Sequence, residues 1–97
     1  MKTSEYGVNR YWLDDNKTVL HRLDGPAVEE RGSYNDWFYE AYYFNGRLHR
    51  LDGPARRYKS KYSDFTNYEE WAINGKILYD IHSQQEFEQY LRLKAFW

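Results

Sequence analysis

The sequence contains no cysteine and no long apolar run. Without cysteine the chain has no disulfide framework, no thiolate metal site and no thiol nucleophile, and its composition fits a reducing cytosol. No apolar stretch approaches the roughly 18 residues that a membrane span requires, and the first residues lack the apolar core of a signal peptide. We therefore expect a soluble, cytoplasmic protein.

The chain also lacks an excess of either charge, because 14 basic and 15 acidic residues leave a net charge of −1. A neutral chain has no overall field that would attract nucleic acid or anionic membranes. The motifs of a nucleophilic serine and of a phosphate-binding glycine loop are missing. Adjacent carboxylates occur, but neighbours on a strand point to opposite faces. We expect no enzymatic activity and no cofactor.

Aromatic residues are abundant, at 21% of the chain, with eleven tyrosines, four tryptophans and five phenylalanines. Tyrosine and tryptophan favour strands and are enriched where proteins contact partners. The composition therefore predicts a strand-rich fold. It leaves two interpretations of the aromatics open: an adhesive face, or wide side chains that cover a thin sheet.

One heptapeptide, His-Arg-Leu-Asp-Gly-Pro-Ala, occurs twice, at 21–27 and at 49–55. The period is 49 − 21 = 28 residues, which indicates a duplicated structural unit. A degenerate third copy at Trp71–Leu78 aligns with Tyr42–His49 at a displacement of 29 residues. Its Asn-Gly pair, like that at 45–46, is typical of a type I′ hairpin turn. The repeat predicts successive β-hairpins.

We expect one domain, 1–97, and a mainly β (α+β) fold: an antiparallel twisted sheet of consecutive hairpins with one C-terminal amphipathic helix. Its expected segments are a loosely held lead-in, a first repeat, a second repeat, a degenerate third repeat and a C-terminal helical segment, at 1–9, 10–36, 37–67, 68–82 and 83–97.

Strands are expected at 10–13 and 18–23, joined by a turn, and a longer strand at 37–44. Apolar residues at both even and odd positions of 37–44 place apolar side chains on both sides of the strand, and they predict a central strand covered on both faces. Residues 59–67 read as a polar loop. The capping box Ser-Gln-Gln-Glu at 83–86 predicts a helix over 84–94 that lies against a face or an edge of the sheet.

The pattern aromatic-x-x-Asn-Gly-x-x-His-Arg-x-Asp-Gly-Pro-Ala, at 42–55 and in part at 12–27 and 71–78, resembles the MORN-like hairpin repeats of bacterial and bacteriophage proteins. The resemblance spans roughly residues 11–79. It implies a twisted sheet of hairpins and a role in holding other molecules without catalysis. It carries over no functional residue.

The His-Arg pairs of the two heptapeptides, His21-Arg22 and His49-Arg50, raise the question of a metal site. Zinc requires three or four converging ligands, whereas equivalent positions on successive hairpins lie far apart. We expect structural roles instead: each arginine pairs with the aspartate two residues later, and each imidazole binds a nearby backbone carbonyl. No metal is expected, and the lone His82 reads as a neighbour of the helix cap.

We expect a non-enzymatic protein-binding module, and the resemblance favours an inhibitor of a host or defence protein encoded by a phage. The expected contact residues are Tyr34, Trp37, Tyr39, Arg56, Arg57, Tyr58 and Tyr62.

A second hypothesis is nucleic-acid binding by the segment 56–62, whose four cations alternate with tyrosines. The corresponding stretch of the first repeat is acidic, so cross-sheet charge balance explains the same residues. An exposed edge strand also offers a route to a homodimer.

Overall fold

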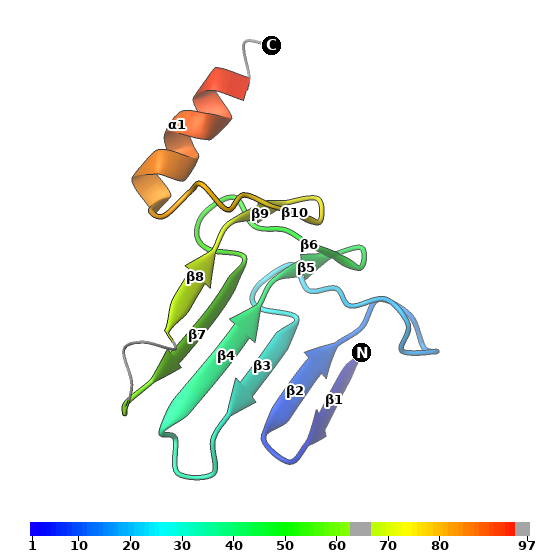
Figure 1. Cartoon of the computed structure of the whole chain (residues 1–97). Coiled ribbons are helices and arrows are strands. Elements are labelled where there is room, and N and C mark those ends of the chain that lie inside the picture. Colours follow the sequence, from blue (N-terminus) through cyan, green and yellow to red (C-terminus); the bar gives the residue numbers. More distant parts are fainter. Residues whose placement is uncertain (63–66, 95–97) are drawn as a thin grey trace.

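The computed structural model describes residues 1–62 and 67–94. Its main element is a six-stranded antiparallel sheet (Figure 1), as the sequence predicts. Across the sheet the strands follow the order β1 (Lys2–Glu5), β2 (Val8–Tyr11), β3 (Val28–Arg31), β4 (Trp37–Ala41), β7 (Arg56–Ser60) and β8 (Tyr68–Glu70).

Two small hairpins leave one end of this sheet, β5 (Tyr43–Phe44) with β6 (Arg47–Leu48), and β9 (Ala72–Ile73) with β10 (Lys76–Ile77). Their turns are the two Asn-Gly pairs, which have positive φ at both positions, as a type I′ turn requires. The first repeat has only a single antiparallel bridge at this place, between Trp12 and Leu20. The strand expected at 18–23 is therefore reduced to that bridge.

Each heptapeptide binds the small hairpin of the following repeat through its histidine. Nδ1 of His21 accepts a hydrogen bond from the backbone N–H of Asn45 at 3.0 Å, and Nδ1 of His49 accepts one from Asn74 at 3.1 Å. Each imidazole thus bonds a backbone N–H, whereas the sequence predicts a bond to a carbonyl group; the described residues show no such bond. The ring proton must then reside on Nε2 in the neutral form. The histidines join consecutive repeats and do not converge.

The arginine of each heptapeptide folds back over its own turn. In the second repeat Arg50 donates to Asp52 at 2.9 Å and to the Pro54 carbonyl at 3.2 Å, and its guanidinium lies 3.9 Å from the ring centroid of Tyr42. The expected arginine–aspartate pairing is confirmed in both copies.

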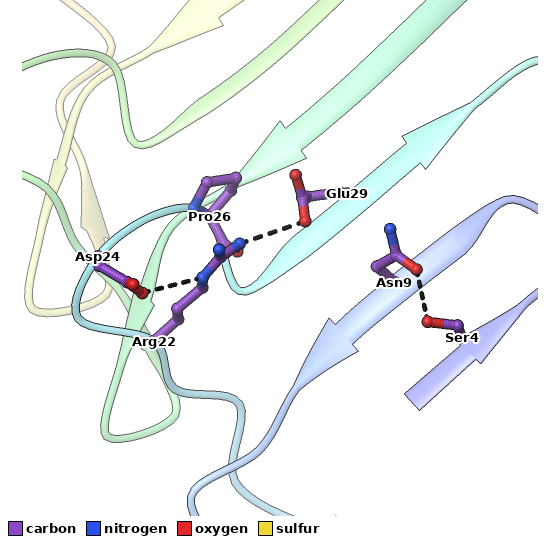
Figure 2. A network of polar contacts seen from close by, with 6 residues as sticks. All are labelled: Ser4, Asn9, Arg22, Asp24, Pro26 and Glu29. Carbon is purple, nitrogen blue, oxygen red and sulfur yellow. Dashed lines mark hydrogen bonds and ion pairs between the residues drawn. The ribbon is translucent and has the colours of Figure 1, made fainter. Parts of the chain in front are cut away.

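Arg22 repeats these contacts in the first heptapeptide, and Figure 2 shows how it lies between Asp24, Pro26 and Glu29. The bond to Glu29, at 3.2 Å, fastens the turn to strand β3. Beneath the guanidinium, the ring centroid of Tyr11 lies 3.9 Å away. The turn of each repeat is thus held by one arginine that contacts an acid, a carbonyl and a ring.

The hydrophobic core is small, and four of the eight buried hydrophobic residues of the described chain are alanines. A cluster around Val28, Ala41 and Leu48 joins the large sheet to the small hairpins, with Tyr39 and Tyr43 packed against it. The molecule is correspondingly flat, with extents of 44 × 37 × 18 Å. In Figure 1 no helix or strand of the described chain is stacked over the six-stranded sheet.

The lead-in expected at 1–9 is an ordered hairpin of β1 and β2, so that expectation is wrong. Its turn is Tyr6-Gly7, with φ values of 50° and 80°. Glycine adopts such a φ without strain, and the pair takes the place of the more recognisable Asn-Gly. β1 is polar on both faces, and β2 has its two apolar side chains, Val8 and Tyr11, on opposite faces, so neither strand shows the alternation that identifies a strand.

The single strand expected at 37–44 is divided into β4 and β5, because the chain leaves the large sheet at Tyr42. There the N–H of Ala27 bonds the Ala41 carbonyl while the N–H of Tyr42 bonds the Ala55 carbonyl. β4 is central, as expected, but most of its side chains are only partly buried. The strand β7 extends to Ser60, and part of the loop expected at 59–67 lies outside the described residues.

The helix α1 (Gln84–Lys94) begins and ends as the sequence predicts. Its first turn is capped by Ser83, whose Oγ accepts the N–H of Glu86 at 3.2 Å. Phe87 is fully buried, and Gln84 accepts a hydrogen bond from the indole of Trp71 at 2.8 Å. The helix projects beyond the small hairpins and covers no broad face of the sheet (Figure 1). Residues 95–97 of the expected helical segment lie outside the described residues.

Candidate protein-binding face

Four aromatic side chains from three adjacent strands share one face of the large sheet: Trp37 and Tyr39 from β4, Tyr58 from β7 and Tyr68 from β8. We call them the aromatic row. Side chains alternate along a strand, so residues directly opposite one another share a face. The registers Tyr39 to Tyr58 and Tyr58 to Tyr68 therefore bring the rings together.

Three of the four rings of the aromatic row, those of Trp37, Tyr58 and Tyr68, stack. The ring centroids of Trp37 and Tyr58 are 6.0 Å apart with planes inclined by 28°, and those of Tyr58 and Tyr68 are 6.0 Å apart with planes inclined by 16°. Such offset pairs contribute roughly 0.5–1.5 kcal/mol beyond their burial. The row is therefore a rigid surface, with little side-chain entropy left to lose when another molecule packs on it.

Burial differs along the aromatic row. Tyr39 packs against the core cluster, and this loss of solvent raises the pKa of its hydroxyl, although the charge of Arg56 acts in the opposite direction. Desolvation also raises the pKa of Tyr68, whose residue is nonetheless 42% exposed. Tyr39 thus anchors the row to the core, while Tyr68 presents its outer end to solvent.

The two arginines expected at the contact surface lie on opposite faces of β7 and both bind carboxylates. Arg56, on the face of the aromatic row, is 2.7 Å from Glu70. Burial lowers the pKa of Arg56, but the hydrogen bond and charge of Glu70 outweigh it and raise the pKa overall. Arg57 points to the other face and is 2.6 Å from Glu40. Neither guanidinium is a free cation.

Tyr34 and Tyr62, the remaining expected contact residues, lie at one end of the sheet. Tyr34 is in the turn between β3 and β4 and is 87% exposed, whereas Tyr62 follows β7 and is 81% exposed. The two segments are joined by a hydrogen bond from the N–H of Lys61 to the carbonyl of Asp36 at 2.9 Å. The structure thus places four of the seven expected residues, Trp37, Tyr39, Arg56 and Tyr58, on one face of the sheet, Arg57 on the opposite face, and Tyr34 and Tyr62 at one end of the sheet.

The structure adds two features that the sequence did not single out. Tyr68 belongs to the aromatic row because it lies directly opposite Tyr58 in the sheet. It stands apart from the other residues of the row in the sequence, which therefore gave no sign of this contact. A hollow of about 390 Å³ also lies between the two heptapeptide turns, where Leu23, Phe44 and Leu51 are exposed. The leucine is the third letter of each heptapeptide, so its repetition was the available signal.

The described residues contain no group of three or more histidine, aspartate or glutamate side chains placed to hold a metal ion. Among the helices of the described chain, none has the length and apolar character needed to span a membrane. Comparisons with known proteins add no assignment: no protein-family model, curated protein or solved structure matches this chain. The resemblance to MORN-like hairpin repeats therefore stays a prediction from the sequence.

Proposed function

We propose that the protein is a non-enzymatic binding module that holds a protein partner on its aromatic row. The observation that carries this proposal is the stack of Trp37, Tyr58 and Tyr68 across three strands, with no described helix or strand stacked over it. Tyrosine and tryptophan are the residues that most often dominate the energetics of protein interfaces.

Two further observations support the same proposal. The row is fixed to the core at Tyr39, so it is already ordered before a partner arrives. Tyr34 and Tyr62 extend from one end of the same sheet with almost their whole surface exposed. An inhibitor of a host or defence protein is the form we propose for this module, on the basis of the resemblance to phage and bacterial hairpin repeats.

Nucleic-acid binding is the weaker alternative. Its basic segment divides between the two faces of β7, and ion pairs neutralise both Arg56 and Arg57, which leaves exposed Lys59 and Lys61. Binding to phosphates weakens steeply with salt, because it releases counterions. A fluorescence anisotropy titration with single-stranded oligonucleotides at 50 and 200 mM salt tests it. Saturable binding with a steep salt dependence would favour this alternative.

Site-specific photocrosslinking tests the proposed face. A photoreactive phenylalanine analogue at position 58 places the label in the aromatic row, and the same analogue at position 59 places it on the opposite face of the same strand. In host cells, we expect one protein to be crosslinked from position 58 and not from position 59. Equal crosslinking from both positions, or none from 58, would contradict the proposal.

A further inference from the structure

The large sheet ends at β8, whose outer edge pairs with no other strand of the described chain. In the second repeat, by contrast, β4 is followed by the returning strand β7, which begins just after Ala55. Adding the displacement of 29 residues to Ala55 gives Gln84, where helix α1 begins. The helix thus replaces the strand that would have covered β8. A hollow of about 360 Å³ beside this edge is lined by Lys59, Asn67, Tyr68, Glu69 and His82.

The backbone groups available at this edge follow from the alternation of hydrogen bonds in an antiparallel sheet. The N–H of Tyr42 bonds the Ala55 carbonyl, so by alternation Arg57 bonds to β4, and Arg56 and Tyr58 bond to β8. Glu69, directly opposite Arg57, therefore turns its own N–H and carbonyl group outward. Its carboxylate forms no ion pair with the described residues.

The strand at the other end of the sheet, β1, also has a free edge with backbone N–H and carbonyl groups turned outward. Met1 and Trp12 exchange two backbone hydrogen bonds, of 3.0 and 2.7 Å, so Lys2 and Ser4 turn their backbone groups outward. Ser4 also donates its hydroxyl to Asn9 at 2.7 Å, as Figure 2 shows. The edge therefore offers a cation at Lys2 together with an unpaired N–H and carbonyl group.

One row of directly opposed residues links the two edges. Directly opposed residues run across all six strands in the order Ser4, Asn9, Glu29, Glu40, Arg57 and Glu69. Opposed residues share a face, so Ser4 and Glu69 lie on one side of the sheet, and Lys2, two residues from Ser4, lies there too. Since the sheet has six alternating strands, β1 and β8 run in opposite directions.

We propose that the free edge of β8 binds strand β1 of a second copy of this chain, so that the sheet continues head to tail from one molecule to the next. When Glu69 lies opposite Lys2 of the second copy, the two strands run antiparallel and both side chains lie on the same face of the sheet. Each of the two residues then turns its backbone N–H and carbonyl group toward the other. This register forms a carboxylate–ammonium pair and places Tyr68 opposite Thr3 of the second copy. The argument for this contact does not rest on the proposed protein-binding function, although Tyr68 of the aromatic row borders the contact.

A twofold pairing of β8 with itself is disfavoured by charge. Such a pairing is centred on the outward-facing residue Glu69 and places two glutamates directly opposite each other, which destabilises a strand pair. The head-to-tail contact instead uses two different edges, so it can continue through many copies. The edge strands have only four and three residues, which keeps the contact weak and dependent on concentration.

Sedimentation velocity on the full chain tests the contact from about 10 μM to 1 mM, the range of weak association. We expect the sedimentation coefficient to rise with concentration. Glu69→Lys and Lys2→Glu should each weaken association about tenfold, because each replaces an attractive pair by a repulsive one. A 1:1 mixture of these two variants should associate again, since every junction in an alternating chain then pairs Lys with Glu.

The matched controls are Glu88→Lys in α1 and Lys76→Glu in β10, which change the same charges at exposed positions outside the two edge strands and should leave association unchanged. Ser4→Pro removes an outward N–H of β1 and should abolish association, whereas Ser4→Ala should not. A chain that stays monomeric throughout, association that survives both edge variants, or a mixture that does not associate would each overturn the proposal.

Discussion

Replacing Arg50 by alanine tests the inference that one arginine holds each heptapeptide turn. The side chain is only 23% exposed and contacts the ring of Tyr42, the carboxylate of Asp52 and the carbonyl of Pro54. The stacking contributes about 0.5–1 kcal/mol, the charged hydrogen bond to the carbonyl about 1.5 kcal/mol and the exposed ion pair up to about 0.5 kcal/mol. Together, they predict a loss of about 2–3 kcal/mol in the free energy of unfolding.

A chain of 97 residues should then melt about 10–15 °C lower, which calorimetry or urea denaturation measures. Arg47→Ala is the matched control, because Arg47 is exposed and lies in no ion pair with the described residues. We expect that variant to change stability by less than about 0.5 kcal/mol.

The same substitution has an independent readout. The hydrogen bond from Arg50, with its charge, holds the pKa of Asp52 below the ordinary 3.8, and an NMR titration of Arg50→Ala should show this pKa returning toward that value. If Arg50→Ala and Arg47→Ala destabilised the fold equally, or if the pKa of Asp52 did not move, the turn would not depend on the arginine.

Four other changes test single features of the fold. The hydrogen bond from the Thr18 hydroxyl lowers the pKa of Asp14 in the folded chain. The ionised Asp14 therefore stabilises the fold above pH 3.8, and this stabilisation is lost as the pH falls through the lower folded pKa. With Asp14→Asn, the free energy of unfolding from urea denaturation should fall less steeply at acid pH. Burial raises the pKa of Tyr39 in the folded chain, so the neutral hydroxyl stabilises the fold below pH 10.0 and this stabilisation is lost as the pH rises through the folded pKa. Tyr39→Phe should remove this decrease of the free energy of unfolding at alkaline pH. Gly46→Ala, at a φ of 79°, should cost about 1 kcal/mol in urea denaturation. Ser83→Ala should cost a similar amount, about 1 kcal/mol, and reduce the helical circular dichroism signal.

The features that the sequence predicted well are those with local chemical causes. The Asn-Gly turns need positive φ at two successive residues, and the helix after Ser83 has a capping box followed by apolar residues at helical spacing. The Arg-Asp pairs lie two residues apart, within reach of one turn. Each of these is decided by a few neighbouring residues, so no tertiary information was required.

The features that the sequence missed depend on pairing between distant strands. The hairpin of β1 and β2 shows no alternation of apolar and polar residues, and its order comes from the β2–β3 register. β4 ends at Ala41 because Tyr42 still donates its N–H to the Ala55 carbonyl of the large sheet but turns its own carbonyl to the N–H of His49 beside the small hairpin. The candidate site shows the same limit. Adjacent residues of a strand point to opposite faces, so the sequence predicts that Arg56 and Arg57 are separated, but it does not show that their carboxylate partners lie on β8 and β4.

The histidine link between repeats has a consequence for how such a chain can change in length. Each His-Arg-Leu-Asp-Gly-Pro-Ala segment accepts a hydrogen bond from the next Asn-Gly turn through its histidine and donates one to the next small hairpin through its arginine N–H, so an inserted 28-residue unit would find both of its junctions already specified. In-frame duplication of one unit would then widen the plate by two strands without redesigning its ends. Growth of this kind adds surface in proportion to length, while the C-terminal helix α1 stays the same.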